Sequence, residues 1–251
     1  MRRLRAWLDR RANLPNHNPA SHAVAPGHLL SGGIMTEFSR LSRHKGCSMR
    51  LAIFGTGGMG RELADIARRD PQIAIVFVSD APAGAVDGIE VISPTDLRPT
   101  DRLVLGIGSS SDRETLAQRL NGYTFWSIVS DQAVVSPSAS LGAGAVVSDF
   151  VVINHSVVIG RHFQANTFVQ VSHDCIIGDY VTLSPRVSCN GWVEIEDSVF
   201  VGAGAIIRNG SPDRRLRIGR RAIVGMGAVV VDDVEPGTTV VGVPAKPLIR
   251  G

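Results

Sequence analysis

The sequence predicts an α/β unit with a parallel sheet, followed by a parallel β-helix built from six-residue repeats. Two observations predict this order. From residue 49 to 128, strand-like segments alternate with amphipathic helical segments. From Val129 onward, aliphatic residues recur every six positions through fourteen repeats. We therefore expect a leader over 1–48, the α/β unit over 49–128 and the repeat domain over 129–251.

The expected elements of the α/β unit are joined by short connections, which favours helices on the faces of a parallel sheet. Leu63, Ile66 and Ala67 would share the buried face of its first helix. Ser111 and Glu114 have the spacing of a capping box at the start of its second helix. The elements are strands at 50–55, 73–80, 102–108 and 123–129 and helices at 60–70 and 111–120.

A glycine loop with GxGxxG spacing follows the first expected strand. Such glycines let the backbone approach a phosphate or ribose, and the N-terminus of the next helix favours negative charge. Only half of a dinucleotide fold precedes the repeats, so a Rossmann-like domain for a mononucleotide-like ligand is favoured over one for NAD. Alternatively, the glycines serve only close packing. The candidate substrate-binding residues, drawn from neighbouring strand ends, are Gly55, Gly57, Gly58, Gly60, Asp80, Gly108, Ser109 and Arg113.

Each hexapeptide carries an aliphatic first position and a mostly small or apolar fifth position, typical of a short strand followed by a turn. The pattern resembles the left-handed triangular β-helix, whose coils take eighteen residues; handedness and coil length come from that resemblance. The register breaks once, between Ile207 and Ile218, where five extra residues form a basic segment. That segment, 208–217, either forms a solvated surface bulge or attracts a phosphorylated ligand.

His155, His173 and Gly191 are eighteen residues apart and should stack on one outward-facing position. A single outward histidine is ordinarily a surface residue. Here Asp174 follows His173 directly, and a glycine adjoins it in the stack. Acyl transfer requires an imidazole base, a carboxylate that orients it and a bare N–H that can stabilise an oxyanion.

Several longer stretches resemble the nucleotide-sugar acetyltransferases of the NeuD and PglD type. They are "FGTGGMGRELADIA", "VSHDCIIGDYVTLSP", "VFVGAGAII" and "VGMGAVVVDDVEPGTTVVGVPAKPL", and the likeness covers about residues 49–250. The resemblance implies an acetyl-CoA-dependent N- or O-acetyltransferase of surface-glycan synthesis that needs no metal. It further implies a homotrimer with active sites between neighbouring β-helices and a nucleotide-sugar substrate bound by the N-terminal domain.

The resemblance also implies roles for individual residues. His173 would be the general base, Asp174 would hold it, and Gly191 would offer its N–H to the thioester carbonyl. Asn166 would lie close to the same site. The coils of Gly202 and Gly225, together with Lys246, would contact acetyl-CoA. The chain departs from PglD-type members at Thr182, where they have a second histidine, and His155 matches no family role.

Composition excludes other classes of protein. No apolar run is long enough to span a membrane. The net charge of +3 comes from residues 1–48, which carry eight Lys or Arg against two acidic residues, so the rest of the chain is mildly acidic and does not indicate nucleic-acid binding. Residues 1–48 are expected to be a disordered leader or to reflect a start assigned too far upstream; a basic arm or targeting segment is the alternative. Three cysteines without CxxC spacing indicate buried thiols in a cytoplasmic protein.

Two other functions remain open from the residues. A noncatalytic trimeric scaffold or sensor would bind a nucleotide sugar without acetyl-CoA. A metal lyase of the carbonic anhydrase kind could use His155 and His173, but such a site needs a third histidine, which neither His162 nor a close histidine pair supplies.

Overall fold

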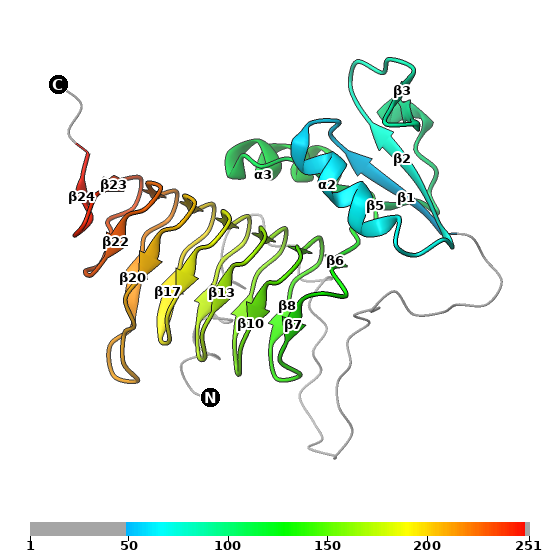
Figure 1. Cartoon of the computed structure of the whole chain (residues 1–251). Coiled ribbons are helices and arrows are strands. Elements are labelled where there is room, and N and C mark those ends of the chain that lie inside the picture. Colours follow the sequence, from blue (N-terminus) through cyan, green and yellow to red (C-terminus); the bar gives the residue numbers. More distant parts are fainter. Residues whose placement is uncertain (1–48, 249–251) are drawn as a thin grey trace. The chain divides into compact units, whose positions relative to one another are not determined.

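The computed structural model describes residues 49–248, so the predictions for residues 1–48 lie outside the described part of the chain. Figure 1 shows the α/β unit and the stacked coils of the β-helix. The parallel β-helix predicted from the six-residue period is confirmed. Within residues 49–248, no helix is both long and apolar enough to cross a lipid bilayer.

The α/β unit contains a five-stranded sheet in the order β3-β4-β2-β1-β5. All its pairs are parallel except that of β3 with β4. Leu63, Ile66 and Ala67 are buried on one face of α2, as predicted. The elements are β1 (Met49–Phe54), α2 (Gly58–Ala67), β2 (Ile73–Val78), β3 (Ala85–Val86), β4 (Ile89–Ile92), the 3-10 helix η2 (Pro94–Asp96), β5 (Arg102–Leu105) and α3 (Ser110–Arg119).

The predicted capping box at Ser111 is wrong. Helix α3 begins at Ser110, and its N-cap is Ser109, whose Oγ accepts a hydrogen bond from the backbone N–H of Asp112 at 3.3 Å. Serine residues stand at 109, 110 and 111, so the sequence offered three candidate caps. The backbone conformation, extended at Ser109, selects the first of them.

The last strand predicted for the α/β unit is also wrong. Phe125 makes only an isolated bridge to Leu103, and Ile128–Val129 is the first strand of the β-helix. The hairpin of β3 and β4 was not predicted, because strands this short carry no clear alternation.

The β-helix consists of very short strands that visit three sheets in turn, all paired in parallel except the last, Lys246–Pro247, which is antiparallel to its neighbour. Before the insertion, each strand pairs with one eighteen residues later, as Val152 does with Gln170. Across the insertion the spacing is twenty-three residues, as between Phe200 and Ile223. We number the sheets as faces. Face 1 holds β6 (Ile128–Val129), β9 (Val146–Val147), β12 (Gln164–Ala165), β15 (Thr182–Leu183), β18 (Phe200–Val201), β21 (Ile223–Val224), β23 (Thr239–Val241) and β24 (Lys246–Pro247); face 2 holds β7 (Val134–Val135), β10 (Val152–Ile153), β13 (Gln170–Val171), β16 (Ser188–Cys189), β19 (Ile206–Ile207) and β22 (Val229–Val230); face 3 holds β8 (Ser140–Leu141), β11 (Val158–Ile159), β14 (Ile176–Ile177), β17 (Val193–Ile195) and β20 (Leu216–Ile218).

The interior of the β-helix is filled by the predicted inward positions. Val171, Ile177 and Leu183 are fully buried, and Cys175 and Cys189 are buried free thiols among them. The five extra residues do not disturb this core, because the pairing resumes in phase with Ile195 opposite Ile218.

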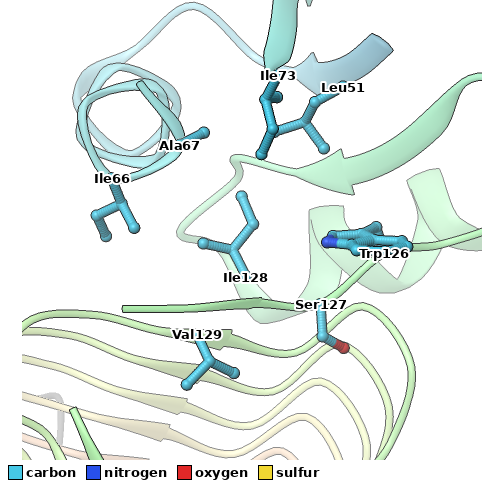
Figure 2. A pocket seen from close by; sticks show the side chains of 8 residues that line it. All are labelled: Leu51, Ile66, Ala67, Ile73, Trp126, Ser127, Ile128 and Val129. Carbon is cyan, nitrogen blue, oxygen red and sulfur yellow. The ribbon is translucent and has the colours of Figure 1, made fainter. Parts of the chain in front are cut away.

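The α/β unit covers the part of face 1 formed by β9, β12 and β15, whose outward side chains Val146, Gln164 and Thr182 are at most 2% exposed. Further along the same face, Ile223 of β21 is 45% exposed. Figure 2 shows a small apolar pocket at this seam, where Ile128 of the first coil shares the lining with Ile66 of α2. The chain therefore exposes faces 2 and 3 of the β-helix and the corners beside them more than face 1.

Candidate active site

The predicted stack of His155, His173 and Gly191 forms at the corner between faces 2 and 3. The backbone N–H of Asp174 donates to the His155 carbonyl at 3.0 Å, and that of Trp192 donates to the His173 carbonyl at 3.2 Å. Asp174 and Trp192 have φ values of 58° and 61°, in the left-handed region that turns each corner. The repeat therefore places these side chains directly above one another.

His173 and Asp174 form a pair on this exposed corner. The Asp174 Oδ2 atom lies 2.9 Å from His173 Nδ1, and the histidine side chain is 56% exposed. A carboxylate at Nδ1 favours the tautomer with hydrogen on that nitrogen, which leaves the lone pair of Nε2 available to accept a proton. A pair with this geometry can act chemically as a general base with its orienting group.

Gly191 lies against the imidazole ring. A Cβ atom there would come within 2.8 Å of His173 Cε1 and 2.9 Å of Nε2, so any side chain would displace the ring. The absence of a side chain at this position is therefore required by the position of His173.

Two residues at this corner were missed by the sequence reasoning. The Trp192 ring meets the His173 ring edge to face, with centroids 6.3 Å apart. Arg215 lies over the Trp192 ring, its Cζ 5.0 Å from the centroid, and donates a hydrogen bond to the Asp174 carbonyl. The signal was available: residue 209, eighteen residues after Gly191, lies within the basic segment 208–217.

His155 has a partner of its own. Its Nδ1 atom lies 2.8 Å from Ser138 Oγ. Among residues 49–248, no group of three or more His, Cys, Asp and Glu side chains is arranged to hold a metal ion.

Asn166, Gly202 and Gly225 form a second stack, at the corner between faces 1 and 2. Each follows a face 1 strand, and their backbone N–H groups donate to the carbonyls of Leu183, Val224 and Val240. The Asn166 Oδ1 atom is buried without a hydrogen-bond partner in the described part of the chain. The structure therefore brings Asn166 together with the predicted acetyl-CoA residues and puts it on a different corner from His173.

The two glycines of this second stack permit close packing of successive coils. A Cβ atom at Gly202 would lie 2.6 Å from the Met226 nitrogen, and one at Gly225 would lie 2.7 Å from Val241 Cγ1. Lys246, on β24, is exposed.

The glycine loop of the α/β unit divides into packing and open positions. A Cβ atom at Gly60 would lie 2.0 Å from the Gly55 carbonyl oxygen, and Gly55 itself has a φ of 112°, so this pair serves the tight turn. Gly57, Gly58 and Gly108 have nothing within 4 Å of a built Cβ. The packing interpretation therefore applies to Gly55 and Gly60, and the backbone at Gly57, Gly58 and Gly108 is left open.

The open glycines lie beside polar groups at the same sheet edge. Gly57 is the N-cap of α2 and provides no side-chain cap, which leaves first-turn N–H groups for water or a ligand. Ser109 caps α3 at the end of the neighbouring strand β5. Asp80, after β2, makes an exposed ion pair with Arg119 at 3.0 Å.

Arg113 does not belong to the predicted ligand site. It is 1% exposed, and its guanidinium donates to the carbonyls of His162 and Tyr180 and to Thr182 Oγ1, all on the β-helix. Burial lowers the pKa of this guanidinium to about 9. Arg113 ties α3 to face 1, and sequence spacing alone could not distinguish this buried role from ligand binding.

Comparisons with known proteins find a matching family and similar chains. Residues 50–120 match the PglD N-terminal domain family. The chain is 40% identical over 211 residues to GDP-perosamine N-acetyltransferase of Escherichia coli O157:H7, covering 79% of this chain and 96% of that protein.

Two solved structures are also similar. The acetyltransferase domain of PglB from Neisseria gonorrhoeae FA1090, in complex with acetyl coenzyme A, is 32% identical with a TM-score of 0.74, covering 81% of this chain and all of that one. PerB from Caulobacter crescentus, in complex with CoA and GDP-perosamine, is 32% identical with a TM-score of 0.70, covering 82% and 99%. The chain belongs to the NeuD/PglD-type family of nucleotide-sugar acetyltransferases.

Proposed function

We propose that the protein transfers the acetyl group of acetyl-CoA to the amino group of a nucleotide-linked sugar, with GDP-perosamine as the first substrate to test. The observation that carries the proposal is the His173–Asp174 pair at 2.9 Å, on an exposed corner and packed against Gly191. Two relatives support the choice of substrate: one is named GDP-perosamine N-acetyltransferase, and PerB was solved in complex with GDP-perosamine. The product would serve surface-glycan synthesis in the cytoplasm.

In the proposed reaction, the sugar amine attacks the thioester carbonyl while His173 Nε2 accepts a proton from the attacking nitrogen. Asp174 keeps the other ring nitrogen protonated and stabilises the imidazolium that forms. The N–H of Gly191 stabilises the oxyanion. Collapse of the adduct breaks the carbon–sulfur bond, and the proton passes from His173 to the departing thiolate, giving CoA and the acetylated sugar.

The α/β unit would hold the nucleotide as a Rossmann-like domain. The open positions Gly57, Gly58 and Gly108 allow phosphate or ribose to approach the backbone at the edge where Ser109 and Asp80 also lie. The uncapped start of α2 favours an anion there. We assign no ligand contact to Gly55, Gly60 or Arg113.

Acetyl-CoA would lie along the stack of Asn166, Gly202 and Gly225 toward Lys246. This stack and the His173 stack occupy different corners of one chain, so a complete site needs the two corners to come from neighbouring chains. The homotrimer implied by the family would bring them together. Phe150 and Phe168, stacked at 4.9 Å and about half exposed beside the Asn166 corner, support a contact there.

The test follows release of free thiol from acetyl-CoA with a panel of amino-sugar nucleotides. We expect GDP-perosamine to be turned over and His173→Ala to lose about 1,000-fold in kcat. His155→Ala is the matched control, since it removes a histidine from the same stack and should retain activity. Nucleotide-sugar binding without turnover would instead support the noncatalytic scaffold. Sedimentation would measure the oligomeric state, because a site shared between neighbouring chains requires an oligomer.

A further inference from the structure

The basic insertion lies on the corner that carries His173. The backbone N–H of Gly210 donates to the Gly191 carbonyl at 3.0 Å, and that of Leu216 donates to the Trp192 carbonyl at 3.2 Å. The chain therefore leaves the coil directly above Gly191 and returns above Trp192. Between these points a small turn forms, closed by the Ser211 N–H and the Arg214 carbonyl at 2.8 Å. The insertion elaborates the corner of the proposed base, and the other two corners keep the regular repeat.

Three neighbouring arginines of this segment have different surroundings. Arg214 is 83% exposed and pairs with Asp233, and Arg217 pairs with Glu196. Arg215 is only partly exposed and donates to the Asp174 carbonyl, and its Cζ atom lies over the Trp192 ring, 5.0 Å from the centroid. A planar guanidinium that stacks and donates at once is held more rigidly than a lysine would be.

We propose that Arg215 is a positioning residue for acetyl transfer, which rests on the function proposed above. Asp174 has the left-handed backbone that turns each corner, and its carbonyl is the group that accepts the hydrogen bond from Arg215. The Arg215 hydrogen bond fixes the peptide that carries Asp174, and the carboxylate of Asp174 fixes the tautomer and direction of His173. Arg215 also packs over the Trp192 ring, which contacts the His173 imidazole edge to face.

The test compares Arg215→Met, which keeps much of the side-chain volume but no donor, with Arg215→Lys and with Arg214→Met as the matched control. Misplacing a catalytic group by about 1 Å costs on the order of 100-fold. We therefore expect kcat of Arg215→Met to fall about 10- to 100-fold while KM for both substrates stays within about twofold. Arg215→Lys should recover part of the loss, and Arg214→Met should match the wild type.

The outcomes separate this inference from the proposed function. Absence of turnover by the wild type, or full activity of His173→Ala, would overturn the function itself. If the wild type is active and depends on His173, a wild-type kcat for Arg215→Met would overturn the positioning role. A raised KM for acetyl-CoA with unchanged kcat would also overturn it, since it would assign Arg215 to phosphate binding. Should Arg215→Met fail to fold, Arg215→Lys decides, with an unchanged kcat counting against the inference.

Discussion

Two histidines at two corners of the same β-helix have opposite surroundings. His162, between faces 3 and 1, is 3% exposed, stacks on Tyr180 with ring centroids 5.2 Å apart, and meets Phe125 edge to face. His173, between faces 2 and 3, is 56% exposed and has a carboxylate at 2.9 Å. The α/β unit covers one corner and leaves the other open. The same residue type in the same kind of turn thus becomes a core group at one corner and a candidate base at the other.

The covered corner should dominate stability. Replacing Arg113 by Met leaves buried carbonyls and the Thr182 hydroxyl without their donor at the seam with α3. We expect a loss of about 4 kcal/mol in the free energy of unfolding, since several buried acceptors are orphaned at once. Urea unfolding would measure it. A loss below about 1 kcal/mol would show that the packing of α3 on face 1 does not depend on the Arg113 guanidinium.

Matched glycines allow the two corners to be compared directly. Gly144 lies under His162, where a Cβ would come within 2.5 Å of Nδ1, and Gly191 lies against His173. We expect Gly191→Ala to lower kcat about 100-fold with little loss of stability, because the exposed imidazole can turn aside. Gly144→Ala should cost about 2 kcal/mol of stability with kcat of the folded protein nearly unchanged, because its ring cannot move and its φ is 74°. Thermal unfolding and steady-state kinetics of both variants would measure these two effects. If the two variants lost the same stability and the same kcat, the two corners would not differ in the way proposed.

The covered histidine should also make stability depend on pH. Burial, with nearby Arg161 and Arg113, lowers the pKa of His162 to about 4, whereas an unfolded histidine titrates near 6.5. The unfolded state therefore binds more protons between these values, and stability falls as pH decreases from about 6.5 toward 4. Between pH 7 and pH 5 the expected loss is about 2 kcal/mol.

Replacing His162 by Phe should remove that part of the pH dependence, because the ring stack is kept and the titrating group is gone. Unfolding at pH 7 and pH 5 would show a smaller difference for this variant than for the wild type. An equal difference would mean that other groups cause the acid sensitivity.

The smallest effect concerns the carboxylate at the open corner. Asp174→Asn keeps a side chain that tolerates the left-handed turn but removes the charge that orients His173. We expect kcat to fall about 10-fold with stability within about 0.5 kcal/mol of the wild type. Steady-state kinetics beside urea unfolding would measure both, and an unchanged kcat would assign Asp174 to the turn alone.

The repeat made most of the β-helix predictable. Because burial recurs every six residues, the inward positions and the end of the insertion at Ile218 followed from counting. The vertical neighbours of His173 followed once the resemblance gave the eighteen-residue coil. Which face the α/β unit covers did not follow, since that depends on contacts between residues far apart in the chain. For this reason Arg113 was placed at the ligand edge although it is buried against face 1.

The candidate site was predictable only where the repeat positions it. His173, Asp174 and Gly191 came together as expected. Trp192 and Arg215 were missed because one looked like an ordinary turn residue and the other belongs to a segment without period. Asn166 was grouped with His173, yet within one chain it lies on another corner, a separation that sequence distance alone does not show.

The five-residue insertion leaves every pairing on either side of it in phase, with Val193 opposite Leu216 and Ile195 opposite Ile218. The register of a coil is set by the strands that it pairs with in the coils above and below, and not by the number of residues in the coil. Each corner can therefore lengthen independently of the hydrophobic interior. An insertion at a corner can thus add side chains beside the His173 stack, as 208–217 does, without altering the hydrophobic interior.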